Sequence, residues 1–163
     1  MLESYPTGLV ACVSDSFNIY EACEKLWGTE LKDEILGRDG VLVIRPDSGD
    51  PCTVILKCLE ILYTQFGGTV NEQGFKVLDP HVRMIQGDGV SYESIAEILK
   101  AVKAAGFSAD NLGFGSGGAL LQRLDRDTQK CAFKCCEIEI GDKHRDVFKA
   151  PITDPGKNSE KGT

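Results

Sequence analysis

The chain has 163 residues, of which 42% are hydrophobic and 26% charged, a composition typical of one soluble globular domain or of a piece of a larger one. The net charge of -7 argues against nucleic-acid binding, which normally requires a basic face. No apolar run approaches the roughly 18 residues that cross a bilayer, and the first ten residues lack the pattern of a secretory signal. We therefore expect a cytoplasmic protein with no membrane or nucleic-acid partner. The seven cysteines show no C-x-x-C pair, which favours free thiols in a reducing compartment.

Three segments each combine an apolar run with a helical pattern. Residues 8–13 predict a buried strand, and a helix follows over 16–28, which we expect to end at Gly28. Residues 41–44 predict a second strand, followed by a helix over 52–66 with Pro51 near its start. Residues 82–85 predict a third strand, and the helix after it has Ser91 and Ser94 as candidate caps.

A fourth unit is predicted from the glycine-rich residues 111–118 and a shorter helix over 119–129, before a strand-like stretch at 131–140. Four such units at roughly 30-residue spacing predict a parallel α/β sheet covered by helices on both faces. A doubly wound sheet and part of a (β/α) barrel are both compatible with this pattern. A complete barrel needs about 250 residues. We therefore expect a fragment, with a partial α/β domain at 1–150 and a polar, flexible tail at 151–163.

Polar or glycine-rich residues follow every predicted strand. They are SDS at 14–16, RPDSGD at 45–50, QGDG at 86–89 and GSGG at 115–118. Both architectures bind ligands at the carboxyl ends of their strands. We therefore expect these four loops to converge on one site.

The chemistry of these loops suits a phosphorylated sugar. The glycines of GFGSGG would expose backbone N–H groups to a phosphate, although a flexible turn explains them equally well. Asp88 would bind sugar hydroxyls, or bond only to its own turn, and Asp15 with Ser16 would line the site or cap the first helix. Four basic residues follow the glycine-rich loop: Arg123, Arg126, Lys134 and Lys149. They would bind an anion together if the fold brings some of them to the same face, and otherwise they are solvated surface charges.

Six motifs together resemble the nicotinamide phosphoribosyltransferase family in order and spacing. They are SDSFNIYEACEKLWG, IRPDSGDP, IQGDGV, GFGSGGALLQRLDRD, CAFKC and VFKAPITDP followed by KGT. The resemblance implies an irregular (β/α) barrel of the type II phosphoribosyltransferase kind and a homodimer. It implies a pentosyltransferase that joins nicotinamide to phosphoribosyl diphosphate, giving nicotinamide mononucleotide and diphosphate in NAD salvage. Mg²⁺ would accompany phosphoribosyl diphosphate, and ATP would stimulate the full-length enzyme.

The resemblance also implies roles for individual residues. Arg45, Asp47 and Asp88 would take part in catalysis, while no metal ligands are assigned. The residues that would bind substrate are Asp15, Arg45, Pro46, Asp47, Gly87, Asp88, Gly117, Gly118, Arg126, Lys134 and Lys149.

Other parts of the family's site are expected outside this chain. The resemblance places the catalytic histidine upstream of residue 1, together with the aromatic residue and the Asp that bind nicotinamide. His81 and His144 lie in other contexts. We therefore expect no turnover from this chain alone, and aggregation or a molten state caused by open sheet edges and uncovered apolar faces. A nicotinate phosphoribosyltransferase fragment, which would share the Asp-Ser-Gly-Asp element, and a non-catalytic phosphate-binding remnant stay open as alternatives.

Overall fold

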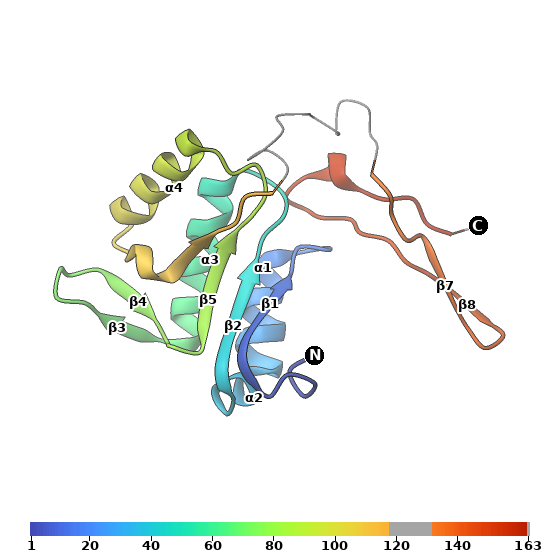
Figure 1. Ribbon diagram of the computed structural model, residues 1–163, viewed down its shortest axis with the longest axis horizontal. Helices are drawn as coiled ribbons and strands as arrows, with labels where there is room; N and C mark the ends of the chain where they lie inside the picture. The colour runs from blue at the N-terminus through green and yellow to red at the C-terminus, as the bar shows by residue number, and fades with distance from the viewer. Residues whose placement is uncertain (118–131, 163) are drawn as a thin grey trace.

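The computed structural model describes residues 1–117 and 132–162, and its main feature is a parallel sheet of four strands (Figure 1). The strand order is β1-β2-β5-β6, so each strand pairs with the next parallel strand along the chain. The bounds are Thr7–Val13 for β1, Asp39–Arg45 for β2, Val82–Gln86 for β5 and Leu112–Phe114 for β6. The α/β class and the parallel sheet predicted from sequence are therefore confirmed.

Helices follow three of these strands. After β1 come α1 (Ile19–Glu21), the π-helix η1 (Ala22–Glu30) and α2 (Lys32–Leu36); after β2 comes α3 (Pro51–Phe66); after β5 come α4 (Tyr92–Ala104) and the short η2 (Ala109–Asn111). The predicted helix over 119–129 lies outside the described residues. No helix within the described ranges is long and apolar enough to cross a membrane.

Two antiparallel hairpins stand apart from the main sheet. The first joins β3 (Gly68–Val70) to β4 (Lys76–Leu78), and the second joins β7 (Glu137–Ile140) to β8 (Lys143–Asp146). The strand-like pattern at 131–140 thus contributes to a hairpin that projects away from the main sheet (Figure 1). A final turn of 3₁₀-helix, η3 (Pro155–Lys157), lies near the chain end.

Local capping explains where α3 and α4 begin. The Asp50 side chain accepts a hydrogen bond from the Thr53 N–H at 2.8 Å, and Pro51 occupies the first turn of α3, where its missing N–H costs nothing. Ser91 and Ser94 form a reciprocal capping box at the start of α4. Both predicted caps of α4 are therefore confirmed.

Two expectations about the first helix are wrong. Gly28 does not end it, because the chain continues as a π-helix to Glu30. A Cβ at Gly28 would lie 2.6 Å from Gln65 Cγ, so the glycine instead lets this helix pack tightly against α3. Asp15 and Ser16 do not cap the helix either, since the Asn18 side chain accepts the N–H groups of Tyr20 and Glu21.

Within residues 1–117 and 132–162, the main hydrophobic cluster lies on one face of the sheet, and the described helices do not cover both faces as expected. Ile44 is fully buried and Met84 is 1% exposed among side chains of α1, η1, α3 and α4. On the opposite face of β1, Leu9 is 70% exposed and Val13 is 49% exposed. Because successive strand residues alternate between faces, an apolar run supplies two apolar faces, and the described helices cover one of them.

Candidate functional site

The loops after β2, β5 and β6 meet at the carboxyl ends of their strands. The Arg45 guanidinium at the end of β2 lies 3.4 Å from Asp47 Oδ1, and its Cζ would lie 2.9 Å from a Cβ built on Gly87. A Cβ on Gly115 would in turn lie 3.8 Å from Gly87 Cα, and the Gly115 N–H donates to the Gln86 carbonyl at 2.8 Å. The structure thus brings the RPDSG, GDG and GFGSG segments together.

Asp15 connects the loop after β1 to the same cluster. This carboxylate is only 1% exposed, and its Oδ2 accepts hydrogen bonds from the Asp47 N–H at 3.0 Å and from the Ser48 hydroxyl. The Ser14 N–H donates to the Arg45 carbonyl at 3.1 Å. Four strand ends therefore contribute to one polar region.

Residues 147–159, which we call the strap, return from β8 toward the arrowheads of the sheet (Figure 1). The N–H groups of Ala150 and Ile152 donate to the carbonyls of Ser16 and Phe17, both at 2.8 Å. The strap is thereby tied to the loop after β1. It includes part of the stretch 151–163 that the sequence analysis separates as a tail.

Two side chains of the strap reach the loops after β2 and β5. The hydroxyls of Thr153 and Ser48 are hydrogen-bonded. The Lys157 ammonium lies 2.6 Å from Asp88 Oδ2 and also donates to the Asp47 carbonyl. Burial alone would lower the pKa of Lys157, but the hydrogen bond to Asp88 and the charges of Asp88 and Asp47 outweigh it, so the pKa is raised. Sequence reasoning assigned Lys157 no role.

Three buried polar atoms at these strand ends have no hydrogen-bond partner within the described residues: Asp15 Oδ1, Arg45 Nε and Gln86 Oε1. Buried polar atoms are normally paired, because an unmade hydrogen bond costs roughly 1–3 kcal/mol. Arg45 and Gln86 are the last residues of β2 and β5, and Asp15 lies two residues after the end of β1. A polar ligand in this region would supply the missing partners. Gln86, like Lys157, was not among the predicted site residues.

The remaining predicted residues are less closely connected. Pro46 is buried within its loop, whereas Gly117 is exposed beyond β6. Lys149 belongs to the strap, where its N–H donates to the Ser159 hydroxyl at 2.9 Å. Lys134 is exposed before β7, and within the described ranges no contact joins it to the loops. Gly118, Arg123 and Arg126 lie outside the described residues.

Both histidines lie away from this cluster. His81 precedes β5, at the amino end of that strand, and its Nδ1 is 2.7 Å from Asp79 Oδ1. His144 is on β8, with Nδ1 2.7 Å from Glu137 Oε1. Neither contacts the strand-end loops within the described part of the chain.

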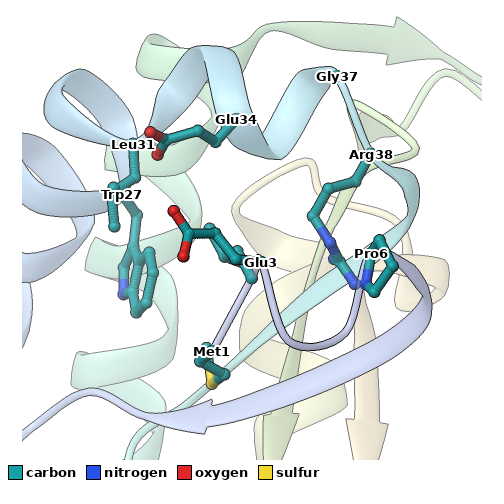
Figure 2. Close-up of a pocket in the computed structure, with 9 residues that line it drawn as sticks. Met1, Glu3, Pro6, Trp27, Leu31, Glu34, Gly37 and Arg38 are labelled. Atoms are coloured by element: carbon teal, nitrogen blue, oxygen red, sulfur yellow. The ribbon is translucent and has the colours of Figure 1, made fainter.

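A separate cavity of about 500 Å³ lies at the amino ends of β1 and β2 (Figure 2). Trp27, Leu31 and Glu34 line one side, while residues 1–3, Pro6 and Arg38 line the other. None of the predicted site residues borders it. Most of the cavity lining thus lies away from the polar cluster, although the Trp27 Nε1–H donates to the Ser14 hydroxyl at 3.1 Å.

Comparisons with known proteins show the family of the chain. The profile of the nicotinate phosphoribosyltransferase (NAPRTase) family matches residues 3–163. Over 96% of its length the chain is 52% identical to the nicotinamide phosphoribosyltransferase of Xanthomonas campestris pv. campestris, of which it spans 33%. It is 36% identical to the enzyme of the same name from Mycoplasma pneumoniae over 98% of its length, spanning 38% of that relative. From these matches, the chain belongs to the nicotinate phosphoribosyltransferase family.

Proposed function

We propose that this chain supplies the phosphate-, ribose- and diphosphate-binding part of a phosphoribosyltransferase site. The complete site would transfer the phosphoribosyl group of phosphoribosyl diphosphate to nicotinamide, giving nicotinamide mononucleotide and diphosphate. The observation that carries this proposal is the meeting of RPDSG, GDG and GFGSG at one end of the sheet. The chain spans about a third of the length of the two named relatives. The reaction of a complete protein that contains this chain is therefore also proposed.

The sheet geometry supports a partial barrel. Its strand order follows the chain without the reversal that creates the switch point of a doubly wound sheet. Helices cover one face, and the other exposes Leu9 and Val13, as the inward face of an open barrel would. We propose that further strands, together with a second copy of the complete protein, enclose this face and the site.

The roles of the clustered residues follow from their charge and position. Arg45 would bind an anionic oxygen of the phosphoribosyl group or of diphosphate, because a guanidinium binds such groups through paired N–H donors. Asp88 would accept hydrogen bonds from ribose hydroxyls between two glycines that permit close approach. Asp47, next to Arg45, would stabilise positive charge that develops at the anomeric carbon as the leaving diphosphate departs.

Mg²⁺ bound with phosphoribosyl diphosphate also belongs to this proposal. No cluster of three or more acidic, Cys or His ligands occurs in the described residues, so an all-protein metal cage is not present there. Mg²⁺ commonly uses one or two carboxylates together with substrate phosphates. The unpartnered Asp15 Oδ1 fits such a contribution. A bound Mg²⁺ would neutralise charge on the leaving diphosphate.

Calorimetric titration of the chain with nicotinamide mononucleotide tests the proposal. We expect binding that Arg45→Ala weakens about 10-fold or more, since a hydrogen bond to a charged group contributes roughly 1.5–3 kcal/mol. Arg145→Ala on exposed β8 is the matched control and should bind like the wild type. Absence of binding by a wild-type chain that circular dichroism shows to be folded, or equal binding by Arg45→Ala, would refute the assignment.

The description of the matching family supports a second candidate, the same transfer to nicotinate. The residues expected to read the base are not among those assigned here, so this chain's site does not discriminate the two. A longer polypeptide that contains these 163 residues would be assayed with nicotinamide and with nicotinate at equal concentrations. Faster turnover of nicotinate would replace the first candidate with the second.

A further inference from the structure

Asp88 lies in a loop with little side-chain support of its own. It sits between Gly87 and Gly89, the latter in the left-handed region at φ +62°, and its side chain is 46% exposed. The Gln86 side-chain amide donates to the Asp88 carbonyl at 2.8 Å, which holds the backbone and leaves the carboxylate free to rotate. Something else must fix the carboxylate if it is to present one oxygen to a ligand.

Lys157 supplies that constraint. Its side chain is 28% exposed, and its ammonium contacts Asp88 Oδ2 at 2.6 Å while donating to the Asp47 carbonyl. Two acceptors on two loops thus define the position of one ammonium. Asp88 Oδ2 is committed to Lys157, whereas no described residue donates to Asp88 Oδ1.

The strap in turn fixes the position of Lys157. Asp154 accepts the Gly156 N–H at 3.0 Å and so caps η3, where Lys157 is the last residue. The Ser159 N–H donates to the Lys149 carbonyl at 3.1 Å just beyond it. With the Thr153 contact to Ser48, the backbone that carries Lys157 is held on both sides.

We propose that Lys157 is a positioning residue, which holds one oxygen of Asp88 so that the other accepts a ribose hydroxyl. This inference rests on the proposed function and adds a residue to the same site. The competing role for a lysine near a phosphoribosyl site is direct binding of phosphate. The observed ammonium already has an anionic partner and a carbonyl partner, so its charge is largely neutralised before any ligand arrives.

The two roles predict different losses for Lys157→Met. A positioning residue affects ligands that use the ribose hydroxyls, so nicotinamide mononucleotide should bind about 10-fold more weakly, in line with the loss of a charge-assisted hydrogen bond. Inorganic diphosphate, which has no ribose, should bind within about 2-fold of its wild-type affinity. The affinities of wild type and Lys157→Met for the 2′-deoxy analogue of nicotinamide mononucleotide should differ less than their affinities for the parent nucleotide.

Calorimetry with these three ligands would measure the losses, with Lys100→Met on the exposed surface of α4 as a control of equal charge change. Backbone amide NMR spectra would check that each variant is folded. If Lys157→Met does not fold, Lys157→Arg keeps the charge with a different donor geometry, and it should weaken the mononucleotide several-fold while sparing diphosphate. Equal losses for diphosphate and mononucleotide, or no loss for either, would overturn the positioning role.

A ligand-free measurement separates this inference from the proposed function. Lack of binding by the wild type would count against the function. The contact is then tested by side-chain NMR of the Lys157 ammonium, which should exchange slowly with water in the wild type and rapidly in Asp88→Asn. Identical exchange in the two chains would overturn the inference by itself.

Discussion

Gly87→Ala tests whether the position of Arg45 matters for ligand binding. The Cβ added at residue 87 would lie 2.9, 3.0 and 3.1 Å from Cζ, Nη2 and Nε of Arg45. Because carbon atoms reach optimal contact at roughly 3.5–4.0 Å, the guanidinium must withdraw by about 0.6 Å or more. The Arg45–Asp47 contact is already 3.4 Å long and would not survive a shift away from Asp47.

The expected result is a large loss of affinity with little loss of stability. Gly87 is not in the left-handed region, and the obstructing atoms end a flexible side chain, so the free energy of unfolding should fall by less than about 1 kcal/mol. Loss of a hydrogen bond from a charged donor costs roughly 1.5–3 kcal/mol, which corresponds to about 10- to 100-fold weaker binding of nicotinamide mononucleotide.

Calorimetry measures the affinity, and the fluorescence of Trp27 during urea unfolding measures the stability at low protein concentration. Gly113→Ala in β6 is the control, because its Cβ would meet Ile85 Cγ1 at an ordinary 3.8 Å. Wild-type affinity in Gly87→Ala would show that the guanidinium position does not matter. A fold lost in Gly87→Ala but kept in Gly113→Ala would show that the Arg45 side chain is too rigidly packed to move away from residue 87.

Three further predictions concern stability and solubility. Gly49→Ala should lower the free energy of unfolding by about 1–3 kcal/mol, because φ is +84° and the Cβ would meet Thr153 Cβ at 2.9 Å; an unchanged urea midpoint would contradict this. Asp50→Ala should cost about 1 kcal/mol at pH 7. Hydrogen bonds from Thr53 lower the pKa of Asp50, so its stabilisation is present above the unfolded pKa and is lost as the pH falls through the folded pKa. Urea unfolding at pH 7 and at pH 3 should therefore show a smaller difference at pH 3, and an equal difference at both would exclude a charged cap. Leu9→Lys should reduce light scattering by the chain without loss of helical circular dichroism, because Leu9 is 70% exposed. Leu42→Lys should unfold the chain, because Leu42 is fully buried. Equal scattering by Leu9→Lys and wild type would show that the uncovered face of the sheet does not cause aggregation.

The elements that sequence analysis predicted well depend on neighbours a few residues away. Pro51 lies in the first turn of α3 as expected, the Ser91 cap satisfies a backbone donor three positions on, and the apolar runs of β2 and β5 are visible without any partner. The shared end of the strand loops was also predictable, since parallel strands place their carboxyl ends together. What local patterns missed was packing, as at Gly28, where contact with α3 decides the role of a glycine.

The role of Lys157 could not be read from local pattern. Its contacts with Asp88 and Asp47 span 69 and 110 residues, and they depend on the return of the strap from the β7–β8 hairpin. A lysine in a polar, glycine-containing stretch is typical of solvated surface, so composition pointed elsewhere. The free thiols, in contrast, needed no long-range information, and the six cysteines in the described ranges are unpaired as expected.

The distribution of unpartnered buried atoms favours ligand binding over imperfect packing at the strand ends. Four such side-chain atoms occur in the described residues. Three of them, on Asp15, Arg45 and Gln86, lie on or just after adjacent strands at the carboxyl end of the sheet, and the fourth, Arg38 Nη1, lies just before β2. Packing defects would be expected to leave hydrogen-bond donors and acceptors unpaired at both ends of the strands with equal frequency. Here one cationic donor lies among acceptors, beside glycines that leave room for a ligand backbone or sugar. We propose that the stability lost at these atoms reflects preorganisation for a ligand that carries both an anionic group and hydroxyl donors.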